Sequence, residues 1–153
     1  STISGSVNGS AATAGTVTTA AQPNITSVGT LTSLSSSGNI TGLNLISTTN
    51  HVFSVATGIS AAGSTQGTAT AITKDLNVVS TVASGAGVIL PAVAGMRMAI
   101  INTSANSLAV YPNSGGAINS QTVNNPYNLP AGGKLDFVST TTTQWYTLNG
   151  TYA

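Results

Sequence analysis

The sequence predicts an all-β protein, in which an extended β-rich segment precedes a compact module of the β-sandwich or jelly-roll type. Three observations lead to this prediction. Short runs of β-branched and aromatic residues alternate with breaks of Gly, Pro, Asn and Ser, and no stretch has helical periodicity. Apolar residues make up 41% of the chain and charged residues only 3%. Disordered chains combine low hydrophobicity with high net charge, so this composition indicates a folded protein.

Composition divides the 153 residues into three parts. Residues 1–50 contain no charged and no aromatic side chain, and we expect them to form an extended Ser/Thr/Gly-rich shaft or arm. Residues 51–66 are expected to be a linker or a first strand. Residues 67–153 are expected to form the sandwich head, because nearly all charges and aromatic rings lie there.

Between residues 25 and 43 of the first part, apolar residues recur at every third position, with one interruption at Ser37. A period of three is neither the 2 of a strand nor the 3.6 of a helix. Three extended chains around a shared axis would bury such positions together, whereas one chain has no second layer for them. We therefore expect a homotrimer, with chance or ordinary short strands as the alternative explanation. The six candidates for the core of the oligomer are Ile25, Val28, Leu31, Leu34, Ile40 and Leu43.

The remaining sequence predicts short strands separated by turns. Alternation is clear at Lys134 and Asp136, which would share one face of a strand while Leu135 and Phe137 share the other. Eight strands are expected, at residues 51–56, 68–73, 76–82, 86–90, 96–102, 107–111, 134–139 and 144–148. The expected core contains Phe53, Val79, Ile89, Leu90, Ile100, Val110, Leu135, Phe137 and Leu148.

The scarcity of charge leaves little scope for catalysis. His51 is the only histidine, and no G-x-S-x-G motif accompanies it. Asp75 and Asp136 are the only carboxylates, fewer than a polysaccharide depolymerase would be expected to show, and Asp136 is expected to pair with Lys134. With no Glu and no Cys, one chain cannot supply a closed zinc site. We therefore predict a protein that is not an enzyme and has no metal and no cofactor.

Binding to nucleic acid or insertion into a membrane is not expected either. The net charge is +1, and the longest apolar run, residues 88–94, is too short to span a bilayer. Tyr111, Asn113 and Tyr127 lie in or directly beside predicted loops, where binding residues concentrate. They are the candidates for contact with a surface sugar, and roles as core plugs or loop anchors are the alternative.

Residues 19–42 read TAAQPNITSVGTLTSLSSSGNITG, and this run resembles the Ser/Thr/Gly-rich repeats of structural proteins of tailed bacteriophages. The similarity is to tail-fibre-like proteins of marine and cyanobacterial phages. The later runs GVILP, IIN, VYP, GAIN and QWY are similar to the terminal β-module of such virion proteins. The resemblance implies a trimeric, surface-exposed virion component and transfers no active site.

The leading hypothesis is a non-enzymatic, homotrimeric phage fibre or appendage component on the outer surface of the virion. Its partners would be its own copies, other virion proteins and a glycan or protein of the host surface. The alternative is a capsid decoration or cement protein whose N-terminal arm clasps the shell. A polysaccharide-degrading tailspike and a non-viral filament subunit are further alternatives.

Overall fold

The computed structural model describes residue 33, residues 35–38 and residues 50–148. The chain divides into two units, Ser1–Ile46 and Ser47–Ala153. Ten strands and one 3-10 turn (Gln66–Thr68) lie in the second unit, and no α-helix occurs among the described residues. The prediction of an all-β protein is confirmed for this part. The extended segment predicted for residues 1–50 lies almost wholly outside the described residues, as do all six candidates for the core of the oligomer.

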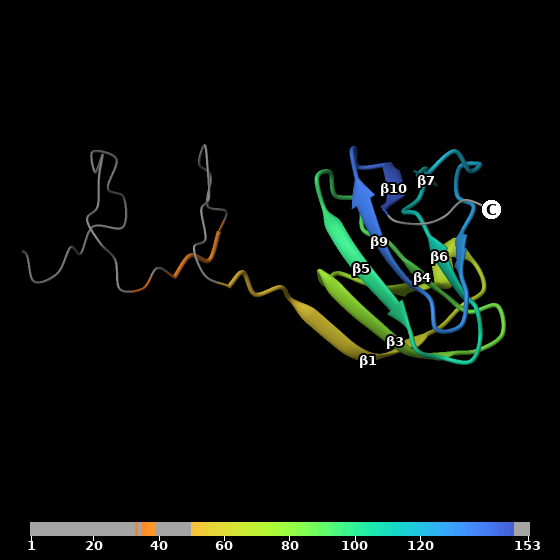
Figure 1. The fold of residues 1–153 in the computed structure, drawn as a ribbon. Coiled ribbons are helices and arrows are strands. Elements are labelled where there is room, and N and C mark those ends of the chain that lie inside the picture. Colours follow the sequence, from red (N-terminus) through yellow and green to blue (C-terminus); the bar gives the residue numbers. More distant parts are fainter. Residues whose placement is uncertain (1–32, 34, 39–49, 149–153) are drawn as a thin grey trace, which may run out of the picture. The chain divides into compact units, whose positions relative to one another are not determined.

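The larger of two sheets has six strands in the order β1-β3-β5-β9-β10-β7 (Figure 1). Strands β1, β3 and β5 are parallel, β9 is antiparallel to both β5 and β10, and β7 is parallel to β10. The bounds are β1 Val55–Ala61, β3 Leu76–Val82, β5 Arg97–Asn102, β9 Lys134–Ser139, β10 Gln144–Leu148 and β7 Ala117–Ile118. Residues 51–66 therefore contribute the first strand.

The smaller sheet has four strands in the order β2-β4-β6-β8. Strands β2, β4 and β6 are parallel, and β8 is antiparallel to β6. The bounds are β2 Thr70–Ala71, β4 Gly87–Ile89, β6 Leu108–Tyr111 and β8 Tyr127–Leu129.

From β1 to β6 the chain passes from one sheet to the other after every strand. Odd-numbered strands enter the large sheet and even-numbered strands the small one, so strands of the same sheet follow each other in parallel. The antiparallel strands β8, β9 and β10 come only after this winding is complete. The two-sheet architecture agrees with the predicted sandwich. The jelly-roll expectation needs correction, because jelly rolls are built from antiparallel strands.

One hydrophobic core fills the space between the sheets. Both sheets supply it, for example Phe137 and Trp145 from the large sheet and Val88 and Val110 from the small one. Six of the predicted core residues are buried: Val79, Leu90, Ile100, Val110, Leu135 and Phe137.

Three predicted core residues lie elsewhere. Ile89 is half-buried, while Phe53 and Leu148 are exposed. Leu148 points outward because Trp145, three positions earlier on the same strand, occupies the core, and side chains alternate between the faces of a strand. Trp145 is buried and its neighbour Tyr146 is partly exposed, as opposite facing on one strand requires.

Candidate functional site: the outer face of the large sheet

The five charged side chains of the chain lie on or beside one sheet. Arg97 is on β5, Lys134 and Asp136 are on β9, and Lys74 and Asp75 directly precede β3. These three strands are neighbours at the centre of the large sheet. A chain that carries so little charge therefore places it in one region, which makes this region the first candidate for a functional surface.

The face of the large sheet that is turned away from the core, here called the outer face, is mainly apolar. One row of paired residues crosses five strands, from Val55 through Leu76, Ala99 and Asp136 to Leu148. The two flanking rows contain Val78, Ile101 and Lys134 on one side, and Arg97, Val138 and Tyr146 on the other. Three charged side chains, Arg97, Lys134 and Asp136, thus lie within a largely apolar surface.

Arg97 and Asp136 form an ion pair across strands β5 and β9. The Arg97 Nη2 atom donates to Asp136 Oδ2 at 2.6 Å, and the two side chains are 65% and 23% exposed. This corrects the prediction of a pair between Lys134 and Asp136, because no ion pair joins these two among the described residues. The guanidinium comes from the adjacent strand and neutralises the carboxylate locally. Pairs of this exposure contribute about 0–1 kcal/mol to stability.

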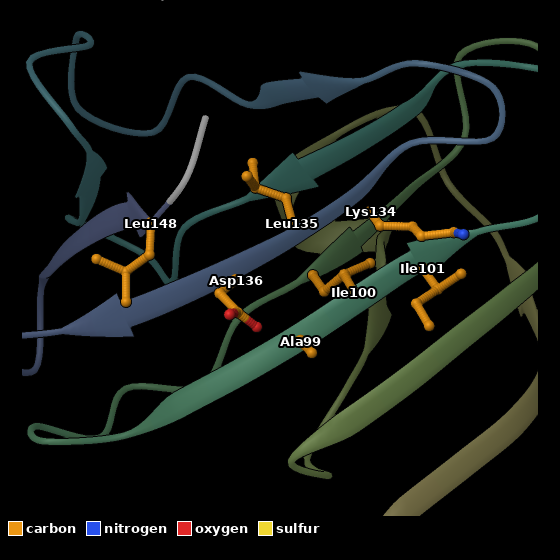
Figure 2. A pocket seen from close by; sticks show the side chains of 7 residues that line it. All are labelled: Ala99, Ile100, Ile101, Lys134, Leu135, Asp136 and Leu148. Carbon is orange, nitrogen blue, oxygen red and sulfur yellow. The ribbon is translucent and has the colours of Figure 1, made fainter. Parts of the chain in front are cut away.

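Two shallow pockets adjoin each other on the outer face. The first, of about 230 Å³, lies over β5, β9 and the end of β10 (Figure 2). Its lining consists of Ala99, Ile100, Ile101, Lys134, Leu135, Asp136 and Leu148. The second, of about 210 Å³, is lined by Phe53, Asp75, Leu76, Arg97, Ala99 and Asp136. Ala99 and Asp136 line both pockets, so the two are neighbours on the sheet.

Asp75 is held in its charged form at the margin of the second pocket. Its Oδ2 accepts hydrogen bonds from the Ser54 hydroxyl at 2.6 Å and from the Ser54 N–H at 2.9 Å. The hydroxyl bond, followed by the backbone bond, lowers the pKa of Asp75 below its usual value of 3.8. Beside it the rings of His51 and Phe53 are in contact, with centroids 4.9 Å apart.

The region therefore gathers the only histidine, both aspartates and the only arginine, yet its geometry favours contact over proton transfer. The Ser54 hydroxyl donates to a carboxylate of lowered pKa, which is a weak base. A glycosidase requires one carboxylic acid with a raised pKa, and Asp75 is shifted in the opposite direction. Among the described residues no group of three or more His, Cys, Asp or Glu side chains is placed to hold a metal ion.

The three residues predicted to bind a sugar lie on the other side of the core, in the small sheet and its connections. Tyr111 is buried and its hydroxyl donates to Ser64 O at 2.9 Å. Asn113 is also buried, and Tyr127 is half-buried with its ring against the edge of Phe137. These placements correspond to the anchoring roles named as the alternative, and they do not favour stacking on a ligand at Tyr111 or Asn113.

Sequence reasoning missed the outer face because Phe53 and Leu148 were assigned to the core. The signal that was available is the alternation on β10, where a buried Trp145 requires Tyr146 and Leu148 to point outward. No comparable signal marks Phe53, which precedes the first strand.

Among the residues that the structure describes, no helix combines the length and the apolar character needed to cross a membrane. No protein-family model, curated protein or solved structure matches the chain. The functional interpretation therefore depends on the residues and their geometry.

Proposed function

We propose that this chain is a non-enzymatic structural protein of a virus particle. In this proposal it is a homotrimeric fibre or appendage component on the outer surface of the virion, and it displays the β module of residues 50–148 toward the host surface. The observation that carries the proposal is the outer face of the large sheet, where exposed and half-buried apolar side chains are interrupted by few charges. Contiguous apolar surface of this kind is typical of sites where proteins meet.

Two features support a structural rather than a catalytic role. The carboxylates of the outer face are engaged, Asp75 by Ser54 and Asp136 by Arg97. The lowered pKa of Asp75 keeps it ionised at neutral pH, where it can accept hydrogen bonds or attract a cation but cannot serve as a proton donor.

The trimeric state in this proposal follows from the period of three in residues 25–43 and from the resemblance to phage fibre proteins. It can be tested by sedimentation of the full chain. We expect a stable trimer at micromolar concentration, and we expect Leu31→Asp to abolish it while the melting transition of the β module persists. A native chain that sediments as a monomer would contradict the trimer.

The location is tested by electron microscopy of virus particles carrying a labelled version of the protein. Label at the tips of fibres or appendages is the expected result. Label distributed over the shell would instead favour the capsid-decoration alternative, in which the N-terminal arm clasps neighbouring subunits. Release of reducing sugar from a host polysaccharide would contradict the non-enzymatic assignment.

A further inference from the structure

We infer that the outer face of the large sheet is the surface through which copies of this chain meet, with the β1–β3 margin of one copy against the β9–β10 margin of the next. The inference rests on the proposed function, since it concerns how the proposed homo-oligomer is assembled. The occupant of the face is a second copy of this chain.

The first support is the distribution of exposed apolar side chains. Seven large apolar residues are exposed among the described residues: Val52, Phe53, Val55, Val93, Val123, Tyr146 and Leu148. Four of them lie in or beside the outer strands of the large sheet. Phe53 and Val55, 59% and 51% exposed, mark the β1 margin, and Tyr146 and Leu148 mark the β10 margin. Both margins therefore offer apolar surface that water solvates unfavourably.

The second support is charge complementarity between the margins. Asp75 lies at the β3 side and Lys134 at the β9 side, with β5 between them. The two positions are separated by two strand spacings across the sheet, about 10 Å, and by three residues along the strands, and no ion pair joins them within one copy among the described residues. Between them Arg97 and Asp136 neutralise each other, and Lys74 lines neither pocket.

The positions of Asp75 and Lys134 determine which margins of two copies can meet. If like margins met, Asp75 would face Asp75 and Lys134 would face Lys134, which is repulsive. If unlike margins meet, each contact brings Asp75 of one copy toward Lys134 of the next. A repeated contact between unlike surfaces is heterologous, and it closes into a ring when the rotation permits. A trimer is the smallest such ring beyond a pair.

The β1 edge of the large sheet is not suited to pairing with a strand of another copy. We therefore assign the contact to the outer face. Strand β1 is an edge strand, but its register with β3 shifts on both sides of Ile59, and Gly58 has a positive φ of 69°. Bulges of this kind interrupt the row of backbone groups that another strand would need for pairing.

The test uses the absence of cysteine from the native chain. Full-length protein carrying both Val55→Cys and Leu148→Cys is treated with a short bis-maleimide and analysed on denaturing gels. Within one copy these positions lie four strand spacings apart, about 19 Å, so a short linker joins only different copies. We expect covalent dimers and trimers from the double variant.

Two control variants distinguish contact between unlike margins from contact between like margins. A chain with only Val55→Cys should stay monomeric on the gel, and so should a chain pairing Val55→Cys with Val123→Cys, whose native valine is equally exposed but lies outside the sheet. Cross-linking of the chain with Val55→Cys alone would show contact between like margins and overturn the inference. No cross-linking of the double variant above these controls would also overturn it.

Reversal of the two charges provides an independent test of the inferred contact. Lys134→Asp and Asp75→Lys should each weaken association by at least tenfold, and the double variant should restore it, because the complementary signs are exchanged. Association unchanged by Lys134→Asp, or a double variant no stronger than the singles, would contradict the inference. Melting curves of each variant identify changes that unfold the module, as Asp75→Lys also removes the acceptor of Ser54.

The outcomes distinguish this inference from the proposed function. A trimer that persists in all of these variants would overturn the inference while the trimeric fibre stands. Cross-linking as expected in a protein absent from virus particles would overturn the proposed function while the inference stands. Glycan binding that is lost in Lys134→Asp without any change in association would assign the face to a ligand and overturn the inference.

Discussion

At Gly87, on β4, the backbone approaches its neighbour too closely for any side chain. A Cβ at this position would lie 2.5 Å from Ala109 O and 2.7 Å from the ring of Tyr111. We expect Gly87→Ala to lower the free energy of unfolding by about 1–3 kcal/mol, the range for overpacking. Gly67→Ala is the matched control, because nothing lies within 4 Å of its Cβ position. Urea denaturation measures both, and equal effects would show that strand β4 can move away from β6.

The hydrogen bonds between Ser54 and Asp75 make the free energy of unfolding of the module depend on pH. Because the pKa of Asp75 is lowered in the folded state, its contribution is complete above the usual value of 3.8 and is lost as the pH falls through the folded pKa. We expect Ser54→Ala to lower the free energy of unfolding at pH 6 by up to about 1 kcal/mol, a small effect because the pair is partly exposed.

The difference between native protein and Ser54→Ala should shrink as the pH is lowered toward 2, because protonation of the carboxyl removes the charge that accepts the hydrogen bonds of Ser54. Urea denaturation at the two pH values provides the measurement. Replacement of the exposed Ser120 by alanine is the control and should have the same small effect at both. A difference for Ser54→Ala that grows on acidification would contradict the assigned cause of the pKa shift.

Single elements were predicted well where alternation is strong. Strands β3, β9 and β10 have the bounds expected from the sequence, because each has regularly alternating or β-branched residues bounded by turn residues. Strands β7 and β8 were missed, since two or three residues are too few to show a period of two. The first strand begins at Val55 instead of residue 51, because an extended chain without a partner resembles a strand in sequence.

The end of β5 is tied to the connection between β8 and β9 by one buried amide. Asn102 Nδ2 donates to Asn106 O at 2.9 Å, to Leu129 O at 3.3 Å and to Pro130 O at 3.0 Å. Each of the three carbonyls keeps another donor, namely Ser104 Oγ, Ser107 Oγ and the Gly133 N–H, so the change removes hydrogen bonds worth about 0.5–1.5 kcal/mol each. We expect Asn102→Ala to destabilise the module by at least that amount, and the exposed Asn128→Ala on β8 by much less.

Thermal and urea unfolding of the two asparagine variants provide the measurement. Equal stability of Asn102→Ala and Asn128→Ala would mean that water replaces the amide at this position. In that case the connection would not depend on the side chain of Asn102.

At the scale of the whole molecule, the order in which strands pair could not be predicted from the sequence. Parallel pairs such as Val78 with Ile101 and Val88 with Val110 join positions far apart in the chain. Local patterns contain no information on whether a chain crosses to the other sheet or turns back in a hairpin. The same non-local pairing builds the outer face, which is why Val55 and Leu148 could be recognised as parts of one surface only from the structure.

The winding also predicts where the folded module opens first. Strand β5 is paired on both sides, with β3 and β9, whereas β1 is paired only with β3 and contains the irregularity at Gly58. Amide groups on a strand paired on one side can exchange by local opening, while those at the centre of a sheet require more extensive unfolding. We therefore expect the amides of β5 to exchange with a free energy close to that of global unfolding, and those of β1 with a lower one.

Hydrogen exchange of the native full-length protein, read by mass spectrometry of peptides from β1, β3, β5 and β9, tests this order. Strand β3 is the internal control, because it pairs with both β1 and β5 and should follow the central strands. If β1 exchanged as slowly as β5, the edge would have to be covered by a segment outside the described sheet, in which β1 pairs only with β3. Comparison with Val55→Asp would then decide whether that cover comes from a neighbouring copy: the protection of β1 would fall while that of β5 is retained.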